Sequence, residues 1–186
     1  DAIDGAKDIL AEVYADDADY RTKLRAMTKE SGSLVAKAKD EEADSVYEMY
    51  YDFSEPIKKL VGHRILAINR GEAEKFLTVK IEAPRQEILL WLVKQIIGNM
   101  KHDSASYLYE AITDSYDRLI APSIEREIRN ELTEKAEEGA IGVFGKNLHQ
   151  LLMQPPISGQ VVLGWDPGFA HGSKLAVVDE TGKVLD

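Results

Sequence analysis

Apolar residues recur at three- and four-residue steps along most of the chain, a period that predicts a mainly α-helical protein. The first such segment is residues 2–14, whose apolar positions are Ile3, Ala6, Ile9, Leu10 and Val13. A second segment carries Tyr20, Leu24 and Met27 at helical spacing and ends near Gly32. Together the two segments predict a helical hairpin with one apolar face.

The next part of the chain has a less regular pattern. Residues 33–38 favour a short extended segment, and the acidic run at 40–42 favours a solvated turn followed by a helix start. The serine, acid and proline at 54–56 predict the beginning of another helix. Four aromatic residues lie between these segments: Tyr47, Tyr50, Tyr51 and Phe53. Because no Arg or Lys is interleaved with them, packing in a core or interface is favoured over a platform on which bases stack.

Helical and strand periods then follow one another. A helix is expected over 63–70, a turn over 71–74 and, from strict alternation of side chains, a strand over 76–81. An apolar helix is predicted over 85–99. Another is predicted over 105–120, with Asp103 or Ser104 as its N-cap.

The longest predicted element begins at Pro122 and runs for about 30 residues, or about 45 Å of helix. Its apolar positions are Ile124, Ile128, Leu132, Ala136, Ala140, Val143, Leu148, Leu151 and Leu152. Pro155 and Pro156 are expected to end it. The glycines at 139, 142 and 145 fit either a close crossing with another helix or a kink, and the sequence leaves both interpretations open.

The last 26 residues, "VVLGWDPGFAHGSKLAVVDETGKVLD", change to a β pattern. An apolar run typical of a buried strand leads to Asp166. A glycine-containing loop follows, and a second strand is predicted over 175–178. A hairpin turn with Gly182 in the left-handed region precedes a third strand that has barely begun. The pattern as a whole predicts a mainly α fold: a multi-helical bundle with one long helix, a small β element and a C-terminal β-hairpin. The expected division is a helical region over 1–156 and a separate element over 157–186.

Charge changes the functional picture. The chain has 23 Lys and Arg against 33 Asp and Glu, a net charge of −10, so it should repel nucleic-acid phosphate at long range. Strong nucleic-acid binding would require a local basic patch or a domain elsewhere. The absence of cysteine excludes disulfides, and no apolar run approaches 18 residues, so a soluble, cytoplasmic protein without a membrane segment is expected. The start at Asp1 without Met and the abrupt end favour a fragment of a longer protein.

Two sets of polar residues outside the C-terminal stretch could carry chemistry. His63 and Arg64, with Asn69 and Arg70, lie on a predicted helix, but Arg64 and Arg70 are more than 200° apart around its axis. They therefore do not form one phosphate clamp, and hydrogen bonds and ion pairs between helices are favoured. The histidines of the chain lack the spacing of metal ligands, so neither a metal site nor a cofactor is expected.

Asp166 is the one candidate catalytic residue. A carboxylate at the end of a strand beside a glycine loop can bind Mg²⁺ for phosphoryl chemistry. Ribonuclease H-like nucleases and actin-like ATPases both begin in this way. Either chemistry needs further carboxylates, and Asp179 and Asp186 lie on a turn and beyond it. We therefore expect this chain to have no enzymatic activity by itself, with a metal-dependent nuclease or resolvase, or an ATPase, as the alternative for a longer protein.

Three stretches carry a resemblance to a known family: "HRILAINRGEAEKFLTVKI", "PSIEREIRNELTEKAEEGAIGVFGKNLHQLLMQPP" and the C-terminal stretch quoted above. Together they resemble the Tex family of bacterial transcription accessory proteins, related to the eukaryotic Spt elongation factors. The specific part is the long helix ending in the NLxxLL pattern, followed by the double proline and then Asp-Pro-Gly. The resemblance covers essentially the whole chain.

The resemblance implies a helical central region followed by the first hairpin of a YqgF domain, which is RuvC-like and ribonuclease H-like. It also implies helix-hairpin-helix domains and an OB-fold RNA-binding domain that this chain lacks. The family loop resembles DPGFRTGCK, whereas this chain has Ala170 where the family has Arg, which removes a cation from the implied phosphate path. The candidate residues of the loop for binding nucleic acid or phosphate are Gly168, His171, Gly172 and Lys174.

The expected function is that of a helical scaffold for nucleic-acid-binding domains, acting in transcription-associated RNA or DNA binding without catalysis of its own. Its expected partners are nucleic acid, contacted through domains outside this chain, and the transcription machinery. The hairpin should also present an unpaired strand edge, through which a homodimer could form.

Overall fold

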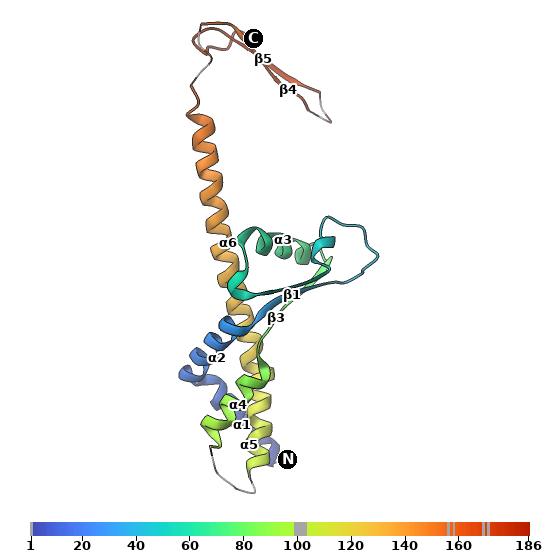
Figure 1. Ribbon diagram of the computed structural model, residues 1–186, viewed down its shortest axis with the longest axis vertical. Coiled ribbons are helices and arrows are strands. Elements are labelled where there is room, and N and C mark those ends of the chain that lie inside the picture. Colours follow the sequence, from blue (N-terminus) through green and yellow to red (C-terminus); the bar gives the residue numbers. More distant parts are fainter. Residues whose placement is uncertain (1, 99–103, 156, 158, 169, 171) are drawn as a thin grey trace. The chain divides into compact units, whose positions relative to one another are not determined.

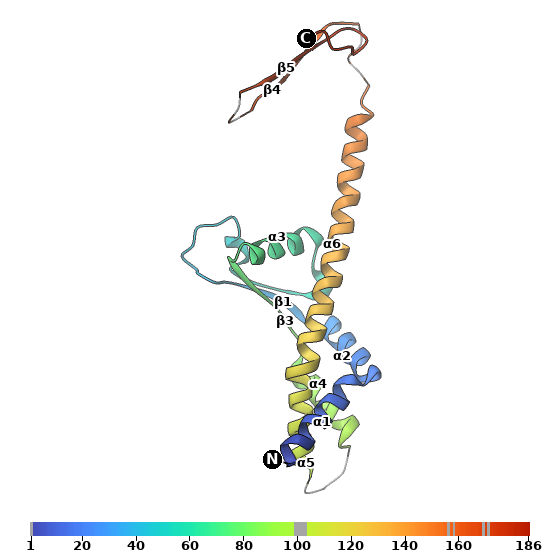
Figure 2. The same ribbon diagram turned by 180° about the vertical axis from the view of Figure 1, so that it is seen from behind.

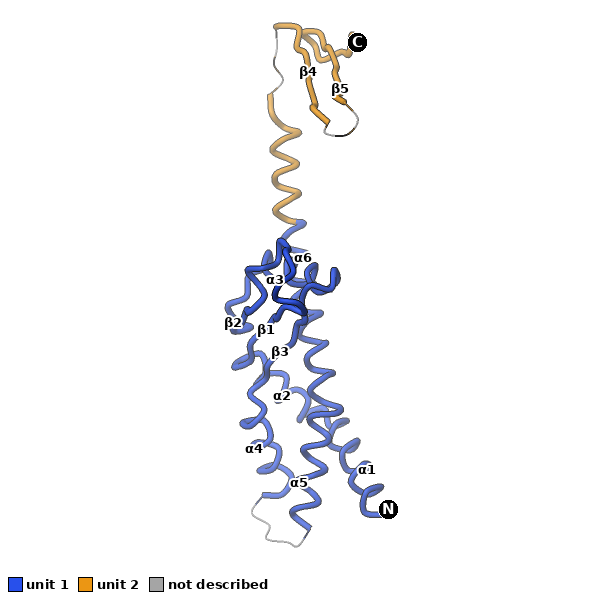
Figure 3. The backbone as a smooth tube through the Cα atoms, turned by 90° about the vertical axis from the view of Figure 1, so that its right-hand side faces the viewer, with its two compact units in different colours: residues 1–141 blue, residues 142–186 orange. Residues whose placement is uncertain are grey.

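The computed structural model describes residues 2–98, 104–155, 157, 159–168, 170 and 172–186 (Figure 1). These residues form two compact units, residues 1–141 and residues 142–186, drawn in different colours in Figure 3. The division falls within one long helix, and the expected domain boundary at 156/157 stays a prediction. Most elements are helical, and two small antiparallel sheets complete the fold, so the predicted fold class is confirmed. Within the described residues, no helix is long and apolar enough to cross a membrane.

The first two helices are α1 (Ala2–Asp16) and α2 (Ala18–Ser31), as predicted. Asp17 separates them and caps α2, because its carboxylate accepts a hydrogen bond of 2.9 Å from the Tyr20 N–H. The Gly32 N–H donates to the Thr28 carbonyl oxygen and so closes the last turn of α2. Local sequence signals therefore account for both ends of this helix.

The predicted apolar face of α1 is wrong. Its buried residues are Ala11 and Ala15, whereas Ile9 and Val13 are 64% and 58% exposed. The reason is close packing against the helical segment that begins at Ser115, whose hydroxyl donates a hydrogen bond of 2.7 Å to the Ala11 carbonyl oxygen. Alanine allows the two backbones to approach so closely, and a larger side chain at this face would separate them.

Three strands form the first sheet: β1 (Ser33–Ala38), β2 (Asp52–Pro56) and β3 (Leu77–Glu82). The order is β2-β1-β3, both pairings are antiparallel, and β1 lies at the centre. On β3 every second residue is buried, which matches the predicted alternation to within one residue. The helix α3 (Gly62–Ala73) lies beside this sheet in the views of Figures 1 and 2 and packs on β3.

Two local predictions in this region are wrong. Residues 54–56 do not begin a helix but end β2, because Ser54 pairs with Val35 and Glu55 with Leu34 across the sheet. The partner strand therefore overrides the capping signal. A short 3₁₀ segment, η2 (Ile57–Lys59), follows. The acidic run at 40–42 is an exposed turn, as predicted, but only another 3₁₀ segment, η1 (Glu48–Tyr50), comes after it.

The predicted turn over 71–74 also begins too early, since α3 continues to Ala73. Gly71 belongs to the packed face of this helix: a Cβ atom there would lie 2.7 Å from the Leu77 Cδ1 atom. The turn that follows uses Lys75, whose φ of 68° lies in the left-handed region. Tyr47 and Tyr50 are 5% and 6% exposed, so these two aromatic residues pack in the core as expected.

The next helices are α4 (Arg85–Ile96), α5 (Ala105–Asp114) and α6 (Ala121–Leu152), and the predicted N-cap candidate Asp103 lies outside the described residues. A π-helical segment, η3 (Ser115–Ile120), joins α5 to α6 without a break, so the predicted helix start at Pro122 is wrong. Proline has no N–H and crowds the carbonyl four residues earlier. The wider π-helical turn, in which the Ala121 N–H donates to the Tyr116 carbonyl oxygen, comes immediately before Pro122.

The first half of α6 belongs to the core, and its second half does not. Ile124, Ile128 and Ala136 are buried, whereas every residue from 137 to 152 is exposed. A Cβ atom added to any of the three glycines at 139, 142 and 145 would meet no described atom within 4 Å, and α6 continues through all of them. Among the described residues they therefore serve no close helix crossing. The helix ends at Leu152, ahead of Pro155, and Pro156 lies outside the described residues.

Candidate functional site

The predicted site lies in the second sheet, a hairpin of β4 (Val162–Asp166) and β5 (Lys174–Val178). The antiparallel register places Asp166 directly opposite Lys174, at the end where the two strands join the loop. Side chains at such cross-strand positions are neighbours, with Cβ atoms about 5 Å apart. Both residues are exposed. The hairpin thus brings together two of the residues that sequence reasoning selected, one acid and one base.

The loop between the strands depends on its glycines. The Gly168 N–H donates a hydrogen bond of 3.1 Å to the Gly172 carbonyl oxygen. A Cβ atom at position 168 would lie only 2.4 Å from that same oxygen, and Gly172 has a φ of +78°. Each position therefore requires glycine for a different reason, one for space and one for backbone conformation. His171, the remaining loop candidate, lies outside the described residues. That these residues bind nucleic acid or phosphate stays a prediction.

One face of the hairpin is apolar and open. Leu163 and Trp165 alternate along β4, and Leu175 lies opposite Trp165; the three side chains are 60%, 70% and 62% exposed. A two-stranded hairpin is marginally stable in water unless such a face is covered. The open face shows that packing from β4 and β5 alone does not complete this part of the fold.

Asp179 lies at the second turn of the hairpin, and its carboxylate accepts hydrogen bonds from residues of that turn. Its carboxylate oxygen Oδ1 accepts hydrogen bonds from the Thr181 hydroxyl, the Thr181 N–H and the Lys183 N–H, at 2.7, 2.8 and 3.0 Å. The bonds from Thr181, and then that from Lys183, lower the pKa of Asp179 below its ordinary value. Gly182 takes a φ of +85°, as predicted for this turn. Asp179 therefore organises its own turn.

The tail beyond this turn pairs with β5. The Val177 N–H donates to the Asp186 carbonyl oxygen, the Leu185 N–H donates to the Val177 carbonyl oxygen, and Val178 bridges to Val184. These contacts are the beginning of the predicted third strand. In the described part of the chain, no group of three or more acids, histidines or cysteines is placed to hold a metal ion.

The polar residues of α3 hold helices and strands together, as the sequence favoured. Arg64 forms an ion pair with Glu55 on β2, with its Nη1 atom 2.8 and 2.9 Å from the two carboxylate oxygens. The Asn69 amide donates to the Thr133 hydroxyl on α6, and Arg129 of α6 forms an ion pair with Glu72. The predicted hydrogen bond between helices is confirmed for Asn69, whereas the ion pair of Arg64 joins its helix to a strand.

Sequence reasoning missed a charged interface between α2 and α6. Arg21 and Arg25 both bind the Glu127 carboxylate, at 2.8 and 2.5 Å, and Lys29 forms an ion pair with Glu131. Three bases at four-residue steps on α2 therefore face two acids at a four-residue step on α6. This spacing is visible in the sequence, but only the fold shows that the two helices are neighbours. A pocket lined by β3, α4, η3 and α6 was missed as well.

Comparisons with known proteins give the family of the chain. Residues 1–144 match the family model described as Tex central region-like, and residues 160–186 match that of the Tex protein YqgF-like domain. The chain is 52% identical over 188 residues to the uncharacterized protein YdcI of Bacillus subtilis, covering all of this chain and 26% of that protein.

More distant relatives agree. The S1 RNA-binding domain-containing protein 1 of Homo sapiens is 35% identical over 195 residues, covering 97% of this chain and 20% of its own length. Protein tex of Bordetella pertussis is 34% identical over 200 residues, covering all of this chain and 25% of its own length. The chain thus spans about a quarter of the length of these curated relatives. Because the central-region model matches more than three quarters of its residues, the chain belongs to the Tex family.

Proposed function

We propose that this chain is a helical scaffold that positions nucleic-acid-binding domains of a Tex-like transcription accessory protein and has no catalytic activity of its own. The observation that carries the proposal is the continuity of α6, which is anchored in the core of unit 1 by Ile124 and Ile128 and continues into unit 2 without a break. A helix of 32 residues is a semi-rigid spacer of about 48 Å.

The ion pairs support this role because they fix α6 to the elements around it. Glu127 binds two arginines of α2, Arg129 binds Glu72 of α3, and Glu125 accepts a hydrogen bond from the backbone N–H of Ile81 on β3. The helix is therefore held on several sides within less than two turns. Its exposed second half has no such contacts in the described residues.

The charge and the relatives support an indirect role in nucleic-acid binding. A net charge of −10 opposes direct binding to phosphate by this chain. The human relative is named for an S1 RNA-binding domain, and the chain covers only 20% of that protein. We therefore assign the contacts with RNA or DNA to other domains of the whole protein, and the positioning of those domains to this one.

A helix breaker in α6 tests the scaffold in the full-length protein. Gly142→Pro should interrupt the exposed half of the helix, whereas Gly142→Ala is the matched control, since no described atom lies within 4 Å of a Cβ at this position. We expect Gly142→Pro to weaken binding to a long RNA or DNA by about tenfold, because a flexible joint lowers the effective concentration of a second binding domain. Equal binding by both variants would contradict the scaffold.

The absence of catalysis is tested separately at Asp166. With Mg²⁺ and branched or single-stranded substrates, we expect no cleavage by the full-length protein above that of the Asp166→Asn variant. Metal-dependent cleavage that Asp166→Asn abolishes would establish the nuclease alternative instead.

The proposal includes a homodimer formed through β4. Among the described residues, β5 pairs on both sides, with β4 and with the tail, whereas β4 pairs with β5 alone. An unpaired strand edge is a site for pairing with a second chain. A mass measurement in solution should give a dimer that Leu163→Pro converts to monomer, since proline removes an N–H from the strand. Monomer at every concentration of the unsubstituted protein would exclude this dimer.

A further inference from the structure

The connection from β1 to β2, residues 39–51, is much longer than the pairing of these strands requires. Neighbouring paired strands are usually joined by about 2–5 residues. The Ala38 N–H donates a hydrogen bond of 2.9 Å to the Tyr51 carbonyl oxygen and closes the base of this β1–β2 loop. From there the loop extends away from the sheet in the opposite views of Figures 1 and 2. Surface loops of this length commonly carry function.

Three tyrosines fix the loop to the core of unit 1 and to itself. Tyr47 and Tyr50 are 5% and 6% exposed and belong to the hydrophobic core. The Tyr51 hydroxyl donates a hydrogen bond of 2.6 Å to the Ala43 carbonyl oxygen and lies 2.9 Å from the Ser45 hydroxyl oxygen. Because a loop anchored in this way is already ordered, it loses little conformational entropy when it binds a partner.

A 3₁₀ turn in the loop places two apolar side chains in solvent. In this type of helix, side chains three positions apart lie on the same side. Tyr47 and Tyr50, at η1, have this spacing and are buried. Val46 and Met49 have the same spacing, one position earlier, and are 85% and 75% exposed. They are the two most exposed large apolar side chains in the described part of the chain.

The packing of the tyrosines keeps this apolar pair in solvent. Val46 and Met49 cannot turn inward unless Tyr47 or Tyr50 leaves the core. Single exposed apolar residues are common on protein surfaces, but a pair on an anchored turn indicates a surface that a partner covers. Methionine in particular is enriched in protein interfaces.

The same loop is strongly acidic. Its five acids are all exposed: Asp40, Glu41, Glu42, Asp44 and Glu48. Together with Lys39 they give the loop a net charge of −4, against −10 for the whole chain. None of the five forms an ion pair within the described residues. A partner that covers the apolar pair would therefore meet a concentrated negative charge.

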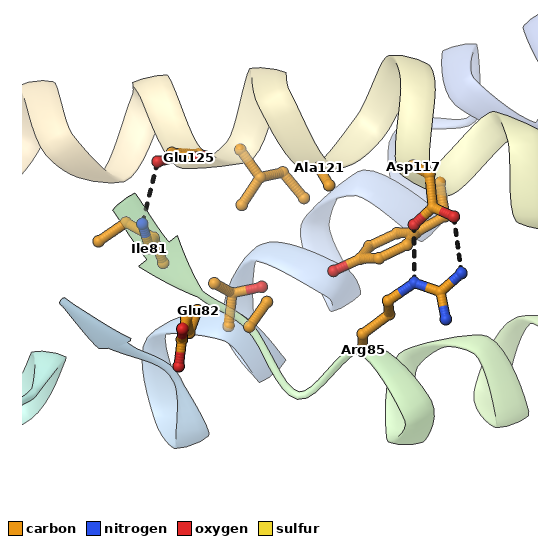
Figure 4. Close-up of a pocket in the computed structure, with 10 residues that line it drawn as sticks. Ile81, Glu82, Arg85, Asp117, Ala121 and Glu125 are labelled. Carbon is orange, nitrogen blue, oxygen red and sulfur yellow. Dashed lines mark hydrogen bonds and ion pairs between the residues drawn. The ribbon is translucent and has the colours of Figure 1, made fainter. Parts of the chain in front are cut away.

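Carboxylates elsewhere in unit 1 are bound by groups of the fold. Figure 4 shows two examples in the pocket between β3, α4, η3 and α6. Asp117 binds the Arg85 guanidinium through both oxygens, at 2.8 and 2.7 Å, and Glu125 accepts a hydrogen bond of 2.9 Å from the Ile81 N–H. The loop acids bind no cation of the described residues, so their charge is available to a partner.

We propose that the β1–β2 loop is a docking site for a basic protein. Val46 and Met49 enter an apolar pocket of that partner, and the loop acids face basic side chains at the rim of the pocket. The apolar pair carries the proposal, and the acids decide the charge of the partner. This contact is additional to the scaffold role of α6 and does not depend on it.

Other occupants fit the loop less well. Nucleic-acid phosphate and anionic lipid headgroups would both be repelled by its net charge. A second copy of this chain is also acidic overall, and its Arg21, Arg25 and Arg129 already bind acids of their own fold. A basic protein surface with an apolar pocket complements both features of the loop.

Photocrosslinking of the full-length protein identifies the occupant. The probe is p-benzoylphenylalanine in place of Val46, and the control carries the same probe in place of Leu90, which is 70% exposed on α4. We expect the probe at position 46, but not at position 90, to give a covalent adduct with one basic protein. The proposal is overturned by no adduct, or by an adduct with nucleic acid, lipid, a second copy or another domain of the same chain.

The purified partner is then titrated with variants of the full-length protein. Val46→Ser combined with Met49→Ser should weaken binding at least about tenfold, mainly through faster dissociation. Leu90→Ser should bind as the unsubstituted protein does. Because all three side chains are exposed, the urea midpoint of unfolding should not change in either variant. Unchanged affinity of the double variant would rule out docking through the apolar pair.

The loop acids are tested by their effect on the association rate. Glu41→Gln combined with Glu42→Gln should slow association at least about threefold at low salt and leave dissociation nearly unchanged, because such charges act mainly in steering. Glu87→Gln combined with Glu134→Gln changes the net charge equally at exposed positions outside the loop and should have a smaller effect. Equal association rates of the two double variants would overturn the assignment of a basic partner.

Discussion

At the scale of single residues, the hairpin loop rests on Gly168. A Cβ atom at this position would clash with the Gly172 carbonyl oxygen, to which the Gly168 N–H also donates. Gly164 is a suitable comparison, because a Cβ there would lie 3.6 Å from the Ala176 carbonyl oxygen, an ordinary contact. A side chain therefore fits at position 164 but clashes at position 168.

We expect Gly168→Ala to open the loop at a cost of about 1–3 kcal/mol, while Gly164→Ala leaves it closed. Amide hydrogen exchange of β4 and β5 measures the difference: exchange should become at least about tenfold faster in Gly168→Ala only. Equal exchange in both variants would mean that the contact between the two loop glycines does not hold the hairpin.

Glu127 is the residue on which the α2–α6 interface depends most. The hydrogen bond from Arg25, assisted by that from Arg21, lowers the pKa of this carboxyl below its ordinary value. A carboxyl whose pKa is lower in the folded state stabilises the fold above its unfolded pKa. That contribution disappears as the pH falls through the folded pKa.

Glu127→Gln should therefore reduce the free energy of unfolding by about 1 kcal/mol at pH 7, a figure discounted because the side chain is partly exposed. The difference should vanish under acidic conditions, below the lowered pKa. Urea unfolding at both pH values measures it, with Glu134→Gln as control because Glu134 is exposed and has no ion pair in the described residues. A loss that persists at acidic pH would assign the effect to packing.

At the scale of elements, α6 has two apolar faces. Its buried residues Ile124, Ile128 and Ala136 lie on one side, whereas Ile141, Phe144, Leu148 and Leu151 follow one another at three- and four-residue steps on another. At about 100° per residue, the centres of the two stripes lie about 170° apart. The single stripe expected over the whole helix is therefore wrong, because its five-residue step from Val143 to Leu148 hides the change of face.

The two stripes should differ in their contribution to the stability of unit 1. Ile128→Ala should lower the free energy of unfolding by about 2–5 kcal/mol, because it leaves a cavity in the core. Phe144→Ala should change it by less than about 0.5 kcal/mol, since Phe144 is 67% exposed. Urea unfolding of the two variants compares them directly. A large loss in Phe144→Ala would show that the second stripe is covered in solution.

A structural feature could be predicted from the sequence when the residues that determine it lie close together in the chain. The end of α2 near Gly32, the alternation of β3 and the glycines of the hairpin depend on near neighbours in the chain, and all were predicted. The strand at 54–56 and the buried alanines of α1 depend on partners far along the chain, and these predictions were wrong. The pocket beside Tyr116 also needs distant segments to meet, so no sequence signal indicated it.

At the scale of the whole molecule, charge and architecture lead to the same account. A net charge of −10 disfavours direct contact with phosphate, and the candidate loop of the hairpin contributes Lys174 opposite an acid. The family match and the partial coverage of longer relatives fit a chain that positions other domains. The central claim is therefore that this chain contributes geometry to nucleic-acid binding and few contacts.

The most direct test is a titration of labelled single-stranded RNA and double-stranded DNA with residues 1–186, followed by fluorescence anisotropy at physiological salt. The scaffold account predicts dissociation constants weaker than about 10 µM that are nearly independent of sequence. Under the same conditions the full-length protein should bind much more tightly. Sub-micromolar binding by the 186-residue chain would contradict the account, because it would place a nucleic-acid interface within the scaffold itself.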